Sequence, residues 1–244
     1  MTQAKSPTLS IVCVVKFPYM DNYNYHKGMN GIIQELTGLL KTKNIGTDSD
    51  RALLLDFQAT LETKPEKAIK LEKDALAQIE NITADNARLV SNLHANLGGL
   101  YRMNGHPDLA REHMEKSISL LDQFNLLHIN DSIPQIANYA MFLTEQQEPE
   151  RGISELQKLS GIIKEYHSDD CLDYAKVQET LGTIYLMTAN LPQAKTHFKR
   201  AFKIYEKIWA DEPEMIEAKY QEIQELYPQI GFCIGKNLSG LLTK

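Results

Sequence analysis

Hydrophobic residues recur at intervals of three and four along much of the chain. One such stripe runs through Leu93, Leu97 and Tyr101, and it stops at NGHP (104–107) before a second stripe begins at Leu109. Apolar positions with this spacing lie on one face of an α-helix. We therefore predict two amphipathic helices here, joined by a short turn.

The same pattern returns at a fixed distance. The segments ANLGGLYRMNGHPDLA (95–110) and ETLGTIYLMTANLPQA (179–194) share Leu, Gly, Tyr, Met and Ala at matching positions, with Gly182 standing 84 residues after Gly98. A degenerate copy lies halfway between them, around Ala140, so the period is 42 residues. The predicted organisation has four units, 49–90, 91–132, 133–174 and 175–216, between a degenerate N-terminal helical repeat or cap (1–48) and C-terminal capping helices (217–244).

Small residues stand twelve positions apart within the units, as in Gly98 and Ala110 or Gly182 and Ala194. Two antiparallel helices can approach closely only where their side chains are short, so we expect these positions to form the contact between the helices of a pair. Proline costs no hydrogen bond in the first turn of a helix. It stands at or near the expected start of each second helix, at Pro65, Pro107, Pro149 and Pro192. The segment 216–227 is expected to form one more first helix.

A 42-residue period also suits HEAT and armadillo repeats, and the internal motif distinguishes between these families. Leu-Gly-x-x-Tyr followed by Ala resembles the tetratricopeptide repeat, and Asn-Leu-Gly-x-x-Tyr at 96–101 looks like the 42-residue repeats of kinesin light chain. The resemblance covers about 49–216, although Asp56 and Glu72 replace the Gly and Phe of the motif in the first unit. It implies an all-α fold, a right-handed α-solenoid of antiparallel helix pairs (a TPR superhelix).

The sequence contains no pattern that indicates catalysis, a metal site or a cofactor. Gly98-Gly99 lies inside a helical pattern without the residues of a phosphate loop, and the seven histidines show no ligand spacing. The triplet HPD (106–108) is also found in J-domains, but the rest of that pattern is missing. We therefore expect His106 and His113 to lie on the solvated surface, and the protein not to be an enzyme.

Composition narrows the class of partner. A net charge of −6 gives no reason to expect nucleic acid, and no apolar run reaches the roughly 18–20 residues of a membrane helix. Three widely spaced cysteines, Cys13, Cys171 and Cys233, fit a reducing compartment. The expected location is cytoplasmic, and the oligomeric state is left open.

The resemblance implies that the first helix of each unit lines a concave groove. Carried over by position, the groove residues are Asn92, Asn96, Arg102, Met103, Asn138, Met141, Lys176, Thr180, Thr183 and Met187. An asparagine amide can bond both the N–H and the C=O of an extended peptide, but it can equally bridge neighbouring helices. The methionines fit either a core or an adaptable apolar surface.

The chain is therefore predicted to be a non-enzymatic scaffold or adaptor that binds a peptide or partner segment in its groove. The chaperone-tail clamp of some tetratricopeptide repeats is not expected, because only Asn138 and Lys176 of its five positions match. One alternative is a regulatory sensor whose superhelix responds to a signalling peptide or ligand. A remoter alternative is an enzyme or effector with its site in the end segments.

Overall fold

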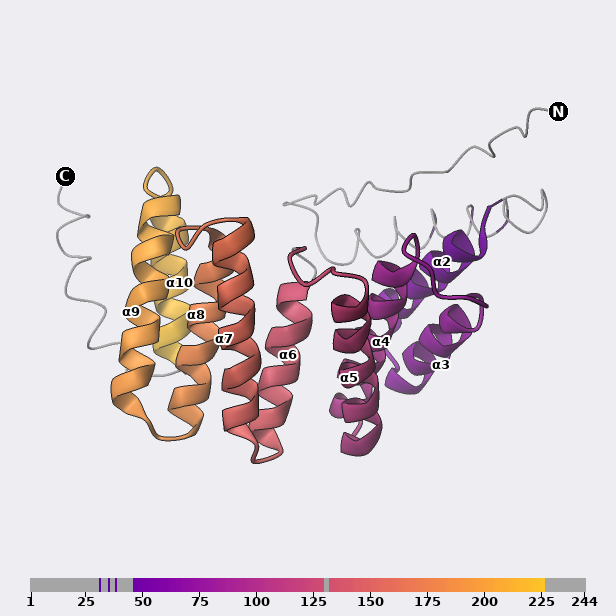
Figure 1. Cartoon of the computed structure of the whole chain (residues 1–244), viewed down its shortest axis with the longest axis horizontal. Coiled ribbons are helices and arrows are strands. Elements are labelled where there is room, and N and C mark those ends of the chain that lie inside the picture. The colour runs from indigo at the N-terminus through magenta and orange to yellow at the C-terminus, as the bar shows by residue number, and fades with distance from the viewer. Residues whose placement is uncertain (1–30, 32–34, 36–37, 39–45, 130–131, 227–244) are drawn as a thin grey trace. The chain divides into compact units, whose positions relative to one another are not determined.

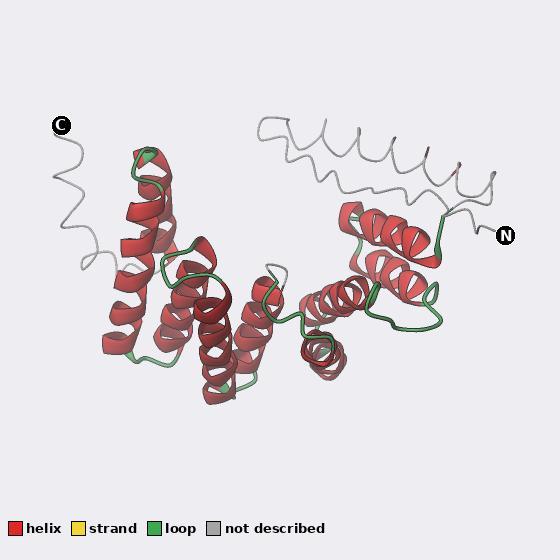
Figure 2. Ribbon diagram, turned by 45° about the horizontal axis from the view of Figure 1, so that its top comes forward, coloured by secondary structure: helices red, strands yellow, loops and turns green. Residues whose placement is uncertain are grey.

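The computed structural model describes residues 31, 35, 38, 46–129 and 132–226. Every regular element with defined bounds in this part of the chain is an α-helix (Figures 1 and 2). The helices are α2 (Asp48–Leu61), α3 (Pro65–Leu76), α4 (Ala87–Met103), α5 (Pro107–Gln123), α6 (Ser132–Glu145), α7 (Pro149–Tyr166), α8 (Leu172–Met187), α9 (Leu191–Ile208) and α10 (Pro213–Leu226). The predicted all-α fold is confirmed.

The chain divides into two compact units, residues 1–126 and 127–244. In the first unit α2 packs against α3, α4 packs against α5, and α4 also contacts both helices of the preceding pair. In the second unit α6 packs against α7 and α8 against α9, while α8 also contacts α6 and α7, and α10 contacts α9. Consecutive helices thus pair as hairpins, and the first helix of one hairpin packs on the hairpin before it.

The helix boundaries follow local sequence signals. Pro65, Pro107 and Pro149 are the first residues of α3, α5 and α7, and Pro192 is the second residue of α9, as predicted. At the start of α2, Thr47 forms a capping box with Asp50: its Oγ1 accepts from Asp50 N at 3.2 Å. Such a cap satisfies backbone N–H groups that have no partner inside the helix.

The turns between paired helices show the repeat in the backbone. Gly105, Gln147 and Ala189 all have positive φ, of 74°, 64° and 59°, and they are spaced by 42 residues. A left-handed residue ends the first helix of each of these hairpins, which is common at a helix C-terminus. This regularity supports a 42-residue period, whereas the unit boundaries themselves remain a prediction.

The small residues of the motif lie where paired helices meet. A Cβ added to Gly98 would lie 2.5 Å from Met114 Cγ, and one added to Gly182 would lie 2.8 Å from the Phe198 ring. In α7, a Cβ on Gly152 would lie 2.6 Å from a backbone oxygen of α6. Real side chains do not approach this closely, so the predicted close contact is confirmed.

The expectation for His113 was wrong. His113 is half-buried in the hairpin α4–α5, where its Nδ1 lies 2.9 Å from Nδ1 of His94. Its ring stacks on Tyr101 with 5.4 Å between ring centroids. A histidine in an amphipathic helix is expected to face solvent when the sequence shows no partner for it. Here His94 on the facing helix is the hydrogen-bond partner of His113.

The hairpin α8–α9 repeats this arrangement 84 residues later. His197 stacks on Tyr185 with 5.2 Å between ring centroids, and its Nδ1 lies 2.9 Å from Oε1 of Gln178. The repeat units 91–132 and 175–216 therefore share side-chain contacts at matching positions as well as a sequence pattern.

Fewer of the predictions can be compared with the structure at the two ends of the chain. The predicted N-terminal repeat or cap (1–48) lies mostly outside the described residues, and the predicted C-terminal capping helices (217–244) are described only up to residue 226. The last described helix, α10, begins at Pro213, three residues before the expected start, because proline again occupies the first turn.

Candidate binding site

In the first unit, Asn96 bridges neighbouring helices. Its Nδ2 donates to Asp56 Oδ1 at 2.9 Å and to Glu72 Oε1 at 3.1 Å, so the amide of α4 contacts one carboxyl from α2 and one from α3. Both hydrogens of Nδ2 are used in this way. Of the two roles considered for this asparagine, the structure shows the bridge.

The other predicted groove residues of α4 differ in exposure. Met103 is 80% exposed at the end of the helix, whereas Asn92 and Arg102 are half-buried. Met103 is the most available apolar side chain of this set, because it is exposed and flexible and can contact a partner without leaving a position in the core.

In the second unit, Asn138 on α6 is exposed and Met141 one turn later is half-buried. On α8, Thr180 Oγ1 donates to the Lys176 carbonyl at 2.9 Å, and Thr183 Oγ1 donates to the Glu179 carbonyl at 3.1 Å. Each hydroxyl has one hydrogen, so both threonines can only accept from a ligand in this conformation.

The remaining two predicted residues of α8 present their side chains to solvent. Met187 is 47% exposed, and the side chain of Lys176 is 54% exposed. The only ion pair described for Lys176 is a long one, with 3.8 Å between its Nζ and Asp173 Oδ1.

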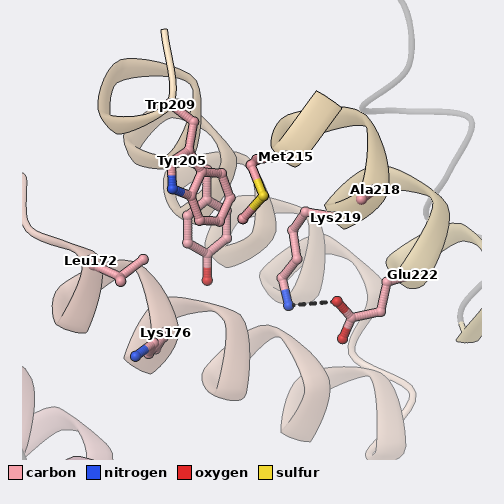
Figure 3. A pocket seen from close by; sticks show the side chains of 8 residues that line it. All are labelled: Leu172, Lys176, Tyr205, Trp209, Met215, Ala218, Lys219 and Glu222. Atoms are coloured by element: carbon pink, nitrogen blue, oxygen red, sulfur yellow. Dashed lines mark hydrogen bonds and ion pairs between the residues drawn. The ribbon is translucent and has the colours of Figure 1, made fainter. Parts of the chain in front are cut away.

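A pocket of about 330 Å³ lies between α8, α9 and α10 (Figure 3). It brings the predicted groove residue Lys176 together with residues that the sequence alone did not indicate. The lining consists of Leu172, Lys176, Tyr205, Trp209, Met215, Ala218, Lys219 and Glu222.

Two stacked aromatic rings form one wall of the pocket. Tyr205 and Trp209 lie one helical turn apart at the end of α9, with 4.8 Å between ring centroids and 10° between ring planes. Tyr205 donates its hydroxyl hydrogen to Glu179 Oε2 at 2.6 Å. Burial and the Glu179 carboxylate raise the pKa of the Tyr205 hydroxyl, so this wall stays neutral.

The charged groups beside that wall neutralise one another. Lys219 Nζ lies 2.8 Å from Glu179 Oε1 and 3.0 Å from Glu222 Oε2, and 5.9 Å from the centroid of the Tyr205 ring. Burial disfavours the charged form of Lys219, but the two carboxylates outweigh it and raise its pKa. Lys219 is thus a cation held by two acids, whereas Lys176 across the pocket is largely exposed.

This arrangement can hold an apolar side chain. The stacked rings, Leu172 and the 44%-exposed Met215 offer apolar surface, and pockets of this kind bury ligand groups while a few polar groups fix their orientation. The feature of the sequence that could have indicated this pocket is the chain's single tryptophan, Trp209, four residues after Tyr205. The lining residues from α10 lie at the very end of the last repeat unit (175–216) or beyond it, so repeat register could not place them.

Among the described residues, no group of three or more His, Cys, Asp or Glu side chains is placed to hold a metal ion. Within the same part of the chain, no helix has both the length and the apolar character needed to cross a membrane.

The sequence of the second unit matches a known family. A tetratricopeptide-repeat profile matches residues 132–207, which include α6–α9. This part of the chain is therefore similar to the tetratricopeptide-repeat family. None of the curated proteins compared with it matches. Tetratricopeptide-repeat proteins are generally non-enzymatic scaffolds for protein partners.

Solved structures show the same fold. BtubC (BKLC) from P. vanneervenii is 16% identical, with a TM-score of 0.69, over 93% of this chain and 94% of that one. A Podosopora anserina kinesin light chain with nearly identical TPR-like repeats is 15% identical, with a TM-score of 0.59, over 79% and 100% of the two chains. MamA is 17% identical, with a TM-score of 0.51, over 78% and 97%. The tetratricopeptide-repeat fold with kinesin-light-chain-like repeats, predicted from 49–216, is confirmed.

Proposed function

We propose that this protein is a non-enzymatic scaffold or adaptor that binds a peptide or partner segment, and that the pocket between α8, α9 and α10 receives one apolar side chain of that segment. One observation carries the proposal: Lys176, a groove residue by repeat register, lines a pocket with a stacked Tyr205–Trp209 wall. Register and geometry thus converge on one place.

The chemistry of the pocket supports an anchoring role. Tyrosine and tryptophan supply large contact areas and dominate the binding energy of many interfaces. Lys176 adds an exposed ammonium at the rim, where a partner carboxylate can form a charge-assisted hydrogen bond. Lys219 adds little charge, because Glu179 and Glu222 already pair with it.

The exposed side chains on the first helices of the second unit extend the proposed surface. Asn138 on α6 and Met187 on α8 are exposed, so an amide and an apolar side chain are available to an extended segment. Met141, Thr180 and Thr183 are partly buried and contribute contact area, with the threonines as acceptors only.

The single tryptophan makes the proposal testable in solution. Peptides would be selected from a displayed random library on the full-length chain, and their affinity measured by fluorescence anisotropy. Trp209 is the only tryptophan of the chain, so its emission reports directly on the pocket. We expect the selected peptides to shift this emission, and Lys176→Ala and Met215→Ala to weaken binding about tenfold each, or 1.4 kcal/mol.

The matched control is Ile82→Ala, which removes an exposed apolar side chain that is not a predicted groove residue and should leave this affinity unchanged. Circular dichroism would verify that all variants keep their helical content. Selected peptides that bind all variants equally and leave Trp209 emission unshifted would show that the pocket is not the binding site.

A further inference from the structure

The hairpin α2–α3 replaces an apolar contact of the other hairpins with two acids. In α4–α5, Gly98 lies against Met114, and in α8–α9, Gly182 lies against Phe198. By the 42-residue register, the same two positions in α2–α3 are Asp56 and Glu72. Two carboxyl groups therefore meet where the fold elsewhere puts a glycine against a large apolar side chain.

The acid pair is largely buried, and Glu72 is incompletely satisfied by hydrogen bonds. Glu72 is only 2% exposed, and its Oε2 has no hydrogen-bond partner. Asp56 is half-buried. The Asn96 amide on α4 donates one hydrogen to Asp56 Oδ1 and the other to Glu72 Oε1. One neutral amide cannot balance two negative charges in such a place.

The neighbours of the pair on its own helices are almost all apolar. The side chains three and four positions away are Ala52, Leu53, Ala59 and Thr60 on α2, and Ala68, Ile69, Ala75 and Leu76 on α3. None of these eight carries a positive charge that could compensate a carboxylate.

The other charged groups of the three helices have different surroundings. Arg51 pairs with Asp48, Asp50 caps α2 through Thr47, and His94 faces His113. Arg102 is in the last turn of α4. The remaining ones, all exposed, are Glu66, Lys67, Lys70, Lys73, Asp74 and Arg88.

We propose that Asp56 and Glu72 share one proton, that this proton closes the contact of the hairpin α2–α3 with α4, and that the contact loosens as the pH rises. With the proton present, one carboxyl donates to the other and Asn96 completes the network. Without it, two adjacent carboxylates repel each other in a buried place, and separating the helices is the way to relieve that repulsion.

The direction of titration agrees with this geometry. Burial, then the charge of Asp56, raise the pKa of Glu72 to about 9, and burial also raises the pKa of Asp56. A carboxyl whose pKa is raised in the folded state stabilises that state fully below its ordinary pKa of 4.5. This contribution declines as the pH rises and is lost by the time the pH passes about 9.

Loosening of the contact between the hairpin α2–α3 and α4 would also change which side chains are available to bind a partner protein. Asn96 is a predicted groove residue whose amide is now occupied by the two acids, so opening would release it. This last step rests on the proposed function, whereas the shared proton does not.

Hydrogen exchange on the full-length chain tests the proposal without any partner. Protection factors, corrected for intrinsic exchange, would be compared between pH 6 and pH 9 for α2–α3, with α8–α9 as internal reference. We expect protection of α2–α3 to fall relative to the reference, by at most about tenfold per pH unit for one proton. Glu72→Gln should remove this relative fall, and Asp56→Asn provides a second variant if the first does not fold.

The matched control is Glu66→Gln, which neutralises an exposed acid on the same helix and should keep the relative fall. A relative fall that is absent in the parent chain, or that persists in both Glu72→Gln and Asp56→Asn, would overturn the proposal.

The proton itself is visible by infrared spectroscopy. A protonated carboxyl band at pH 7 that disappears in Glu72→Gln is the expected result, and its absence from the parent chain overturns the proposal. A rise in the melting temperature on adding Ca²⁺ that needs both Asp56 and Glu72 would show a metal ion in place of the proton, and would also overturn it.

Discussion

The hairpins α2–α3 and α8–α9 have the same helical pairing but opposite chemistry at the same contact. In α8–α9, Gly182 admits the ring of Phe198, which is completely buried. In α2–α3, the same positions hold Asp56 and Glu72 under the amide of Asn96. The comparison shows that the repeat requires two helices in close contact at this point, and that the means of contact can differ.

The two solutions differ in what they contribute to stability. Burying a phenylalanine side chain stabilises a fold by roughly 1.5–3 kcal/mol. Burying a hydrogen-bonded acid pair returns little net free energy, because desolvation offsets the interactions gained. The apolar hairpin is therefore indifferent to pH at this contact, whereas the acidic one depends on a proton.

The largest expected effect comes from moving the acid into the apolar hairpin. Phe198→Glu removes a fully buried ring and leaves a carboxylate against Gly182, without an acid partner or an amide like that of Asn96. We expect a loss of about 3–5 kcal/mol in the free energy of unfolding at pH 7, measured by urea denaturation. Lys199→Glu, at the exposed neighbouring position, should cost less than about 0.5 kcal/mol. Equal losses in the two variants would refute the buried role of Phe198.

The repeat motif predicted most of the buried apolar residues of these hairpins. Leu97 and Ala110 are fully buried, and Tyr101 is 7% exposed, because periodicity and small-residue spacing report directly on helix faces and helix contacts. Repeat register also identified the positions of Asp56 and Glu72 as departures from the motif. It could not show that the two acids lie against each other under Asn96.

The candidate site was less predictable for a related reason. Lys176 follows from the motif, but its pocket is completed by Trp209 and Met215 near the end of the last repeat unit (175–216) and by Lys219 and Glu222 beyond it. His113 was misjudged because its partner, His94, lies nineteen residues earlier on the facing helix. Polar contacts between helices depend on side-chain directions, which hydrophobic periodicity does not specify.

A second, smaller effect concerns the histidine pair of α4–α5, whose pH dependence should run opposite to that of the acids. Burial, then the charges of His113 and Lys116, lower the pKa of His94 to about 4. The unfolded chain therefore takes up a proton first as the pH falls below 6.5, and the hairpin loses stability towards pH 4.

The hairpin α8–α9 supplies the variant that tests this, because Gln178 stands at the position of His94. We expect His94→Gln to reduce the loss of stability between pH 7 and pH 5 by roughly 1 kcal/mol, measured by thermal unfolding at both pH values. His106→Gln changes an exposed histidine and serves as the control. An unchanged pH dependence in His94→Gln would mean that the pair does not carry the acid sensitivity.

The smallest expected effect concerns a hydroxyl pair. Ser91 and Ser117 are buried, with 3.1 Å between their Oγ atoms, whereas the corresponding residues of α8–α9 are Ala175 and Ala201. Ser91→Ala removes this partner from the buried Ser117 hydroxyl and should cost roughly 1 kcal/mol. Ser117→Ala should cost less, because the Ser91 hydroxyl still donates to the Ser117 carbonyl at 3.1 Å, and the double change should be close to neutral. A double-mutant cycle by urea denaturation measures the coupling, and strictly additive losses would contradict it.

The stacked tyrosine and histidine of α4–α5 and α8–α9 have a consequence for how the chain arose. The intervening hairpin α6–α7 carries Leu143 and Glu155 at the corresponding positions, so the stack recurs every 84 residues and not every 42. In evolutionary terms, this sharing is expected if a block of two hairpins was duplicated as one piece, because two hairpins separated by a third then keep the same aromatic contact.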